Sequence, residues 1–212
     1  MTQGSDARIA LVREGYERAA RAYRGDEYPL VKSGYAHWLK RLARRLPAGA
    51  RVLDLGCGNG VPVARELARR YAVTGLDLSP AQIERARGLV PAATFVCGDM
   101  TEVEFAPGAF DAVVAFYSII NVPVERQAAL IQRVAGWLAP GGWVLFIVGR
   151  RAWTGTEPDW RGVAGVRMFY SLADESQYRA WCAAAGLTIV EEGVQPKRGN
   201  PGFAVLIARK AG

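Results

Sequence analysis

The chain has 212 residues, of which half are hydrophobic and 22% are charged, and this size and composition suit one globular domain with its own apolar core. No apolar stretch is long enough to span a bilayer, and the first ten residues lack a signal-peptide profile, so we expect a cytoplasmic protein without membrane contact. The net charge is +7, and three widely spaced cysteines with a single histidine argue against a zinc site, so we expect no metal.

The positive charge is concentrated near the N-terminus, where residues 1–46 carry ten Lys and Arg against five Asp and Glu. Such a bias could mark a nucleic-acid-binding region. However, Lys40, Arg41, Arg44 and Arg45 share the polar side of one expected helix, and no basic patch is interleaved with stacking aromatic residues. The bias therefore favours a solvated helix face, and nucleic acid is not the expected partner.

The first expected elements are two amphipathic helices, over residues 8–24 and about 33–46. Tyr16 and Tyr23 are seven residues apart on one face of the first helix, where they either pack against the core or close over a ligand. His37 lies off the apolar stripe of the second helix. It is the only side chain that titrates near neutral pH when unperturbed, which makes it a candidate base, although a lone histidine on a helix more often has a surface or packing role.

The next stretch, residues 52–60, is typical of a buried strand followed by a turn with glycine at positions 56, 58 and 60. Glycine at such a turn lets a ligand approach the backbone, whose N–H groups face it at the start of the helix expected over 61–71. A nucleotide-like ligand is therefore the first hypothesis. Val61 stands where the dinucleotide fingerprint needs a third small residue, so a nicotinamide oxidoreductase is a poorer alternative.

Acidic residues follow at the ends of the next two expected strands. Asp77 lies at the end of the run 73–78, where a carboxylate can accept hydrogen bonds from both hydroxyls of a ribose. Asp99 and Met100 follow the run 94–98, and an acceptor for an exocyclic amine beside an apolar side chain suits an adenine ring. The spacing thus points to a nucleoside.

From residue 51 the pattern alternates strand and helix, which indicates a parallel sheet with helices on both faces and ligands at the carboxyl ends of the strands. The expected strands cover about 51–55, 73–77, 93–97, 110–116 and 142–148, followed by 187–191 and 203–209, and the expected helices cover about 60–70, 80–88, 124–138 and 174–185. Between the last two strands, Lys197 and Arg198 could contact a substrate or belong to a solvated loop.

Residues 149–170 break this alternation, and we expect them to form a long loop without regular structure. They directly follow the carboxyl end of the fifth strand and are rich in Trp, Arg and Gly. We interpret them as a segment that covers the site, in which Trp153, Trp160 and Tyr170 form an apolar wall. The alternative is an ordinary connection with a few packed aromatic side chains.

Three short motifs carry a resemblance to a known family: VLDLGCGNG at 52–60, GLDLS at 75–79 and GDM at 98–100. With FDAVVAFYSI at 110–119 and LAPGGWVLF at 138–146, they resemble class I S-adenosylmethionine-dependent methyltransferases, of the small-molecule, natural-product branch. The resemblance implies an α/β fold with a Rossmann-like, doubly wound seven-stranded sheet, mostly parallel with an antiparallel last strand, and a helical N-terminal lid. It also implies S-adenosylmethionine as cofactor and S-adenosylhomocysteine as product.

Over the whole chain, the resemblance implies a single methyltransferase domain, residues 1–212. Within this domain we expect a helical lid at 1–47, a cofactor-binding core at 48–148, a substrate-covering segment at 149–172, and a C-terminal helix and strand pair at 173–212. A monomer or a homodimer would suit such a domain. The class would place the protein in secondary metabolism.

By the same resemblance, the cofactor would contact the glycine turn, the two acidic strand ends, the end of the fourth strand and the two lid tyrosines. The expected cofactor-binding residues are Tyr16, Tyr23, Gly56, Cys57, Gly58, Asp77, Leu78, Gln82, Asp99, Met100, Phe116 and Tyr117. Ser118 should also lie near the sulfonium. The expected substrate contacts are Trp153, Trp160 and Tyr170, and the candidate catalytic residues are His37, Tyr117 and Tyr170.

The expected reaction is transfer of a methyl group to a small, apolar or aromatic acceptor, at O, N, S or an electron-rich carbon. It proceeds by in-line displacement, to which the protein contributes mainly positioning. Residues 116–123 lack the N-P-P-Y-like sequence of the enzymes that methylate amines of nucleic-acid bases. Two alternatives remain: an RNA methyltransferase that uses the basic N-terminal region, and a non-catalytic, cofactor-binding partner subunit.

Overall fold

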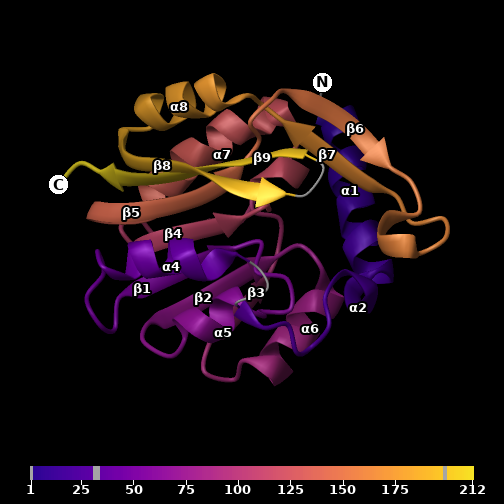
Figure 1. Ribbon diagram of the computed structural model, residues 1–212, viewed down its shortest axis with the longest axis horizontal. Coiled ribbons are helices and arrows are strands. Elements are labelled where there is room, and N and C mark those ends of the chain that lie inside the picture. The colour runs from indigo at the N-terminus through magenta and orange to yellow at the C-terminus, as the bar shows by residue number, and fades with distance from the viewer. Residues whose placement is uncertain (1, 31–33, 198–199) are drawn as a thin grey trace.

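A seven-stranded sheet forms the centre of the protein in this computed structural model, which describes residues 2–30, 34–197 and 200–212 (Figure 1). The strand order is β3-β2-β1-β4-β5-β9-β8; the first five pair in parallel, and β9 runs antiparallel to both of its neighbours. The strands are β1 (Arg51–Leu55), β2 (Ala72–Asp77), β3 (Thr94–Cys97), β4 (Phe110–Phe116), β5 (Leu138–Val148), β8 (Leu187–Lys197) and β9 (Asn200–Lys210). The predicted doubly wound, mostly parallel sheet is confirmed.

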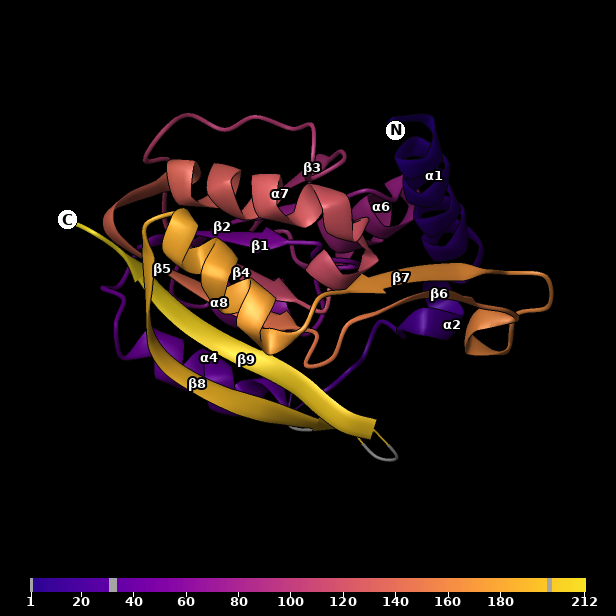
Figure 2. The same ribbon diagram turned by 90° about the horizontal axis from the view of Figure 1, so that it is seen from above.

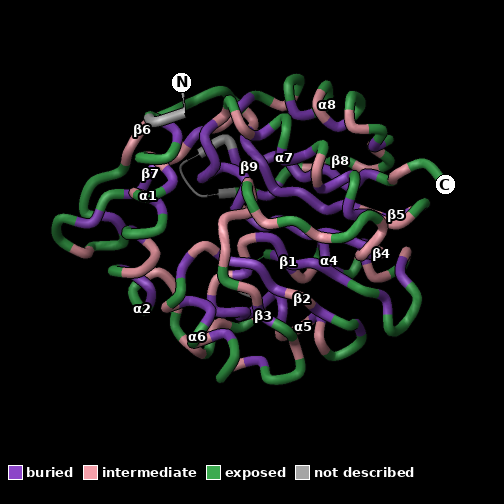
Figure 3. The backbone as a smooth tube through the Cα atoms, turned by 180° about the vertical axis from the view of Figure 1, so that it is seen from behind, coloured by how far each residue is buried: buried purple, intermediate pink, exposed green. Residues whose placement is uncertain are grey.

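Helices cover both faces of this sheet. Successive side chains of a strand point to opposite faces, so Val52 and Leu53 belong to two different apolar clusters, one on each side. Helices α4, α5 and α6 contribute to the first cluster, and α7 and α8 contribute to the second. The helices are α1 (Thr2–Arg18), α2 (Ala20–Tyr23), α4 (Tyr35–Ala43), α5 (Val63–Leu67), α6 (Pro80–Leu89), α7 (Val124–Trp137) and α8 (Glu175–Ala184). The central strands are buried along their length, whereas outer loops and much of α8 are exposed (Figure 3).

The segment after β5 forms an antiparallel pair, β6 (Trp153–Glu157) and β7 (Met168–Leu172), with a short 3₁₀ turn between them. The expectation of a loop without regular structure at 149–170 is therefore wrong. Met168 and Phe169 pack with Val12 of α1 in a third apolar cluster, and α1 and β7 lie side by side (Figure 2). Because a helix from the other end of the chain completes this cluster, no local pattern revealed it.

Other element boundaries differ from the expected ones by a few residues. Helix α1 begins earlier than residue 8, and Ala19 separates it from α2; α5 has five residues where about ten were expected. Strand β5 starts four residues early, at Leu138, where its register with β4 shifts. The expected helix start at Ser33 and the residue Arg198 lie outside the described residues. Within the described ranges, no helix is both long and apolar enough to cross a membrane.

Candidate active site

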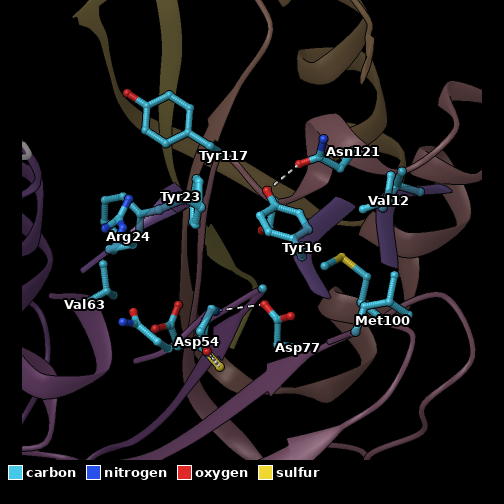
Figure 4. Close-up of a pocket in the computed structure, with 18 of the residues that line it drawn as sticks. Val12, Tyr16, Tyr23, Arg24, Asp54, Val63, Asp77, Met100, Tyr117 and Asn121 are labelled. Atoms are coloured by element: carbon cyan, nitrogen blue, oxygen red, sulfur yellow. Dashed lines mark hydrogen bonds between the residues drawn. The ribbon is translucent and has the colours of Figure 1, made fainter. Parts of the chain in front are cut away.

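A pocket lies at the carboxyl ends of β1, β2, β3 and β4, and side chains of α1, among them Val12 and Tyr16, line it from the other side (Figure 4). This is the edge at which ligands bind in open α/β sheets. Eleven of the twelve expected cofactor-binding residues line it: Tyr16, Tyr23, Gly56, Cys57, Gly58, Asp77, Leu78, Asp99, Met100, Phe116 and Tyr117. The expected Ser118 lines it as well. The fold thus brings together residues that are up to a hundred positions apart in the sequence.

The glycine turn forms the floor of this pocket. The amides of Gly56 and Cys57 both donate to the carbonyl oxygen of Leu76, at 2.7 and 3.0 Å, which holds the turn against β2. Gly56 and Gly58 have φ angles of +78° and +55°, a region that L-residues with a side chain rarely adopt. A Cβ on Gly58 would meet no atom within 4 Å, so open space lies above this residue. A ligand can therefore lie directly against the backbone.

Asp77 is held rigidly at the end of β2. Its Oδ2 accepts a hydrogen bond from the amide of Gly58 at 2.8 Å, and its Oδ1 accepts one from the amide of Ser79 at 3.0 Å. Burial raises the pKa of this carboxyl to about 6, against the lowering effect of these two amides. The glycine turn and Asp77 thus form one rigid unit, in which the carboxylate keeps lone pairs for a ligand.

Asp54 is the acidic residue that the sequence motifs did not single out. It lies within β1 and is 2% exposed, and its Oδ2 has no hydrogen-bond partner. Burial, reinforced by the charge of Asp77, raises its pKa to about 7. A buried, unpaired carboxylate oxygen costs free energy unless a donor or cation reaches it. The pocket therefore suits a ligand that places a positively charged group beside Asp54.

Asp99 and Met100 line the pocket after β3, as the sequence predicted. The Oδ1 of Asp99 accepts hydrogen bonds from the amide and the hydroxyl of Thr101, at 2.8 and 2.9 Å, which orients the carboxylate. Met100 and the α1 side chains Ile9 and Val12 supply apolar surface beside it. An acceptor next to an apolar wall is what a flat, amine-bearing heterocycle requires.

Aromatic side chains close the pocket on the side of α1. The ring of Tyr16 packs edge-on against Tyr23 and Trp160, with centroids 5.2 and 5.1 Å apart, and Trp160 stacks on Tyr23 at 5.2 Å. The Tyr16 hydroxyl donates to Oδ1 of Asn121 at 3.1 Å, and Trp160 Nε1 donates to the hydroxyl of Tyr170 at 2.8 Å. Trp160 and Tyr170 thus support the tyrosines from behind and do not line the pocket.

Two further contacts hold α1 over the site. Near its end, Glu17 accepts hydrogen bonds from the hydroxyl of Ser79 and from the amide of Ala81, at the N-terminus of α6. Near its start, Ser5 and Arg8 both donate to Glu125 of α7. Helix α1 is therefore attached on both sides of the pocket, in the position of a lid.

Besides Trp160 and Tyr170, three expected site residues do not line the pocket. His37 is exposed on the outer side of α4, and its Nε2 accepts a hydrogen bond from Arg41 at 2.9 Å, because the apolar stripe of α4 faces the sheet. Gln82 is buried in α6, and its backbone N–H donates a hydrogen bond to the hydroxyl of Ser79. Trp153 is 53% exposed on β6 and lies beside the ring of Tyr170. His37 is therefore not in a position to act as the base.

Tyr117 stands at the end of β4 with a φ angle of +62°, which is unusual for a residue with a side chain and is typical of functional sites. Its ring packs against Tyr35 and Phe203. Burial raises the pKa of Tyr117 well above its usual range and raises that of Tyr170 to about 12. Both hydroxyls therefore stay protonated at neutral pH and act as hydrogen-bonding groups.

The basic side chains of α4 and of the turn that follows it are partly engaged within the protein. Arg41 and Arg45 both form ion pairs with Glu191 of β8, which reduces the free positive charge on this face. In residues 2–30, 34–197 and 200–212, no three His, Cys, Asp or Glu side chains gather in an arrangement that could hold a metal ion.

Comparison with known proteins agrees with this geometry. A family described as "Methyltransferase domain" matches residues 29–192, well over half of the chain. The chain belongs to this family. Its sheet, glycine turn and acidic strand ends are those of a class I S-adenosylmethionine-dependent methyltransferase, and S-adenosylmethionine is the cofactor of the class.

Curated relatives of this methyltransferase act on different small molecules. The 27-O-demethylrifamycin SV methyltransferase of Amycolatopsis mediterranei is 36% identical over 142 residues, which are 61% of this chain and 52% of that protein. The trans-aconitate 2-methyltransferase of Methylobacterium nodulans is 31% identical over 157 residues, 68% of this chain and 60% of that protein. The chain thus spans between half and three fifths of the length of these two relatives.

Solved structures share the fold of this methyltransferase at low sequence identity. The 1,6-didemethyltoxoflavin-N1-methyltransferase of Burkholderia thailandensis, solved with 1,6-didemethyltoxoflavin and S-adenosylhomocysteine, superposes with a TM-score of 0.74 at 19% identity. The match covers 98% of this chain and 91% of that one. The agreement in fold thus extends over nearly the whole chain.

Replacing Asp54 by Asn in this methyltransferase should raise the stability of the ligand-free protein more at pH 8 than at pH 5. The folded-state pKa of about 7 lies above the unfolded value of 3.8, so stability is lost as pH rises from about 4 to 7, and the loss stays constant above that window. Asn removes this charge. We expect the gain from the substitution to be about 2 kcal/mol larger at pH 8 than at pH 5. Urea unfolding at both values measures it, and equal gains would contradict the buried-charge account.

Proposed function

We propose that the protein transfers a methyl group from S-adenosylmethionine to a small apolar or aromatic molecule. One observation carries the proposal: three acidic residues from successive strand ends, Asp54, Asp77 and Asp99, line one pocket together with the open glycine turn, under a cap of aromatic rings. A ligand with a net positive charge and an adenosine group suits these acids. When bound, the cofactor supplies an activated methyl carbon on a sulfonium.

The residues present fit this cofactor. The open space above Gly58 would admit its sulfonium region, and the ribose would lie against Asp77, whose carboxylate is already oriented by two amides. Asp99 and Met100 would hold the adenine, with Ile9 and Val12 against its face. The unpaired oxygen of Asp54 would receive a positively charged group. The open turn and the three acidic residues thus each correspond to one part of the cofactor.

The acceptor side is aromatic. Tyr23, Tyr35 and Tyr117 line the pocket. Trp160 stacks on Tyr23 and donates a hydrogen bond to the hydroxyl of Tyr170. Such rings bind flat, apolar molecules and exclude water from the reacting atoms. Two relatives that methylate small molecules support this choice of acceptor class, whereas the pairing of Arg41 and Arg45 with Glu191 gives no support to RNA.

Catalysis in this proposal consists of positioning. With His37 on the outer surface and both candidate tyrosines protonated, the residues of the pocket orient the acceptor rather than deprotonate it. Holding two reactants in line is worth up to about 7–11 kcal/mol in favourable cases, which is enough to account for a large rate enhancement.

Replacing Tyr117 by Phe should therefore leave kcat within about threefold of the wild type, with an unchanged pH profile, because the hydroxyl does not ionise near neutral pH. Steady-state kinetics between pH 6 and pH 9 measure both quantities. A loss of about a hundredfold or more, together with a shifted pH profile, would identify Tyr117 as a general base instead.

The experiment for the function itself has two parts. Isothermal titration calorimetry with S-adenosylhomocysteine tests the cofactor site, and we expect binding in the micromolar range. Incubation with radiolabelled S-adenosylmethionine and a panel of phenols, carboxylic acids, amines and nitrogen heterocycles tests the transfer. Binding without transfer to any of them would support a non-catalytic partner subunit, and absence of binding would overturn the proposal.

A further inference from the structure

Asn121 is a buried pocket residue that lies outside the sequence motifs. It ends a short 3₁₀ turn, Ile119–Asn121, that follows β4, and it is 7% exposed. Its Nδ2 donates to the carbonyl oxygen of Phe169 in β7 at 2.7 Å, and its Oδ1 accepts from the hydroxyl of Tyr16 in α1 at 3.1 Å. Asn121 therefore connects the end of β4 with the lid helix and with the β6–β7 pair.

The two hydrogen bonds of Asn121 can run in one direction only. A backbone carbonyl oxygen accepts but cannot donate, so the NH₂ group of the amide must face Phe169 and its oxygen must face Tyr16. The hydroxyl of Tyr16 therefore has to donate its single proton to Asn121. Burial raises the pKa of Tyr16 well above its usual range, so the hydroxyl keeps this proton at neutral pH. Its oxygen can offer only lone pairs to a ligand.

The oxygen of Tyr16 is fixed at the wall of the pocket. Edge-on contacts with the rings of Tyr23 and Trp160 hold the phenol ring in place. Figure 4 shows the hydroxyl pointing towards Asn121 and away from Asp77. Within the described parts of the chain, no residue donates a hydrogen bond to this oxygen. A fixed acceptor in an otherwise aromatic pocket selects a ligand that can donate a hydrogen bond to it.

The protein core contains the same arrangement with its remaining position filled. The hydroxyl of Tyr178 donates to Oε1 of Gln127 at 2.7 Å, and Nε2 of Gln127 donates to the carbonyl oxygen of Ser171 at 2.6 Å. The oxygen of Tyr178 in turn accepts from the amide of Ala173 at 3.4 Å. At Tyr16 the corresponding position faces the pocket, and a ligand can supply the donor there.

We propose that the oxygen of Tyr16, with its polarity fixed by Asn121, accepts a hydrogen bond from the methyl acceptor, and that the site thereby selects aromatic molecules with a hydroxyl or a ring N–H. The inference rests on the proposed function and names its acceptor class. Tyr16 determines the specificity, and Asn121 is a positioning residue that acts through it. Because the chain of hydrogen bonds ends at a backbone carbonyl, it binds the acceptor's proton without removing it.

The test uses two pairs of ligands of similar size, in which only one member is a donor: 2-naphthol with 2-fluoronaphthalene, and indole with 1-benzothiophene. Equilibrium dialysis measures their affinities for the protein saturated with S-adenosylhomocysteine. In the wild type we expect the donor of at least one pair to bind about tenfold more tightly than its partner. In Tyr16→Phe, which keeps the ring, this ratio should fall below about threefold. No preference in the wild type, or an unchanged ratio in Tyr16→Phe, would overturn the proposal.

Two substitutions of Asn121 separate its effect on polarity from its effect on the fold. Asn121→Leu and Asn121→Asp both lose the NH₂ group that donates to Phe169, so both should lose stability. Leucine accepts nothing from Tyr16, whose proton can then turn to the ligand, so the ratio should fall below about threefold. Aspartate still accepts from Tyr16 and should keep the ratio near tenfold. Equal loss of the ratio in both variants would mean a purely structural role and would contradict the proposal.

Tyr178→Phe and Gln127→Leu are the matched controls. Each removes the equivalent group from the arrangement in the core, and neither residue lines the pocket. Both variants should therefore lose stability, measured by urea unfolding, and keep the wild-type ratio of affinities. If these controls lost the ratio as fully as Tyr16→Phe does, the preference would depend on general stability and the proposal would be wrong.

The affinity for the cofactor product separates this inference from the proposed function. If the wild-type protein fails to bind S-adenosylhomocysteine, the proposed function itself is wrong. If it binds this compound and methylates acceptors without any preference for donors, only the present inference fails. Tyr16→Phe should bind S-adenosylhomocysteine within about threefold of the wild type. A loss of about tenfold or more would mean that the oxygen of Tyr16 binds the cofactor, and would overturn the inference.

Discussion

Replacing Gly58 by Ala should abolish cofactor binding in a protein that still folds. Gly58 has a φ of +55°, so a side chain there costs roughly 1 kcal/mol of folding stability, a loss that a domain of this size tolerates. The new methyl group would meet no protein atom within 4 Å and would project into the space above the turn. We expect affinity for S-adenosylhomocysteine to fall by more than about 100-fold, measured by calorimetry.

Gly49→Ala is the matched control for this substitution. Gly49 has a φ of +77°, and a Cβ there would likewise meet no atom within 4 Å, but this residue lies in an exposed turn before β1 and does not line the pocket. The two variants should lose similar stability, and only Gly58→Ala should lose the cofactor. Gly56 is unsuitable for the comparison, because a Cβ there would lie 2.2 Å from Cβ of Ser118 and disturb the fold. Unimpaired binding by Gly58→Ala would show that the ligand does not lie over the turn.

Replacing Asp77 by Asn should weaken the binding of S-adenosylhomocysteine by about 100-fold. Both carboxylate oxygens accept hydrogen bonds from amides, of Gly58 and Ser79, and an Asn side chain has only one acceptor oxygen. Its NH₂ group would face one of these N–H groups, so the turn would shift and a ribose would lose an acceptor. Calorimetry with S-adenosylhomocysteine and with adenosine measures the effect, and we expect both ligands to lose affinity.

Asp174→Asn controls for the general loss of a carboxylate that accepts from backbone amides. Asp174 accepts hydrogen bonds from the amide of Gln177 and the hydroxyl of Ser176 at the start of α8, and it does not line the pocket. Its replacement should cost a few tenths of a kcal/mol to about 1 kcal/mol of stability and leave the affinity unchanged. If Asp77→Asn lost stability but kept its affinity for both nucleosides, Asp77 would have a structural role alone.

The fold and the pocket floor were predictable because their signals are local. The strand at 51–55, the glycine turn and the acids at the ends of β2 and β3 are each read from fewer than ten consecutive residues, and parallel strands bring their carboxyl ends to one edge. The same reasoning missed Asp54. This acid lies inside a short apolar strand, and only the structure shows that it is buried and that one of its oxygens has no hydrogen-bond partner.

By itself, the sequence determined the class of sheet, the glycine turn and the acidic strand ends, since apolar periodicity and turn chemistry act over a few residues. Only the tertiary structure decided which distant side chains meet. It joined Trp160 to Tyr16 and Tyr23 and turned His37 outward. It also joined Tyr16 to Asn121. These contacts join segments that are separated by up to about 140 residues, and they depend on how helices and strands pack as whole surfaces, a property that no short stretch of sequence contains.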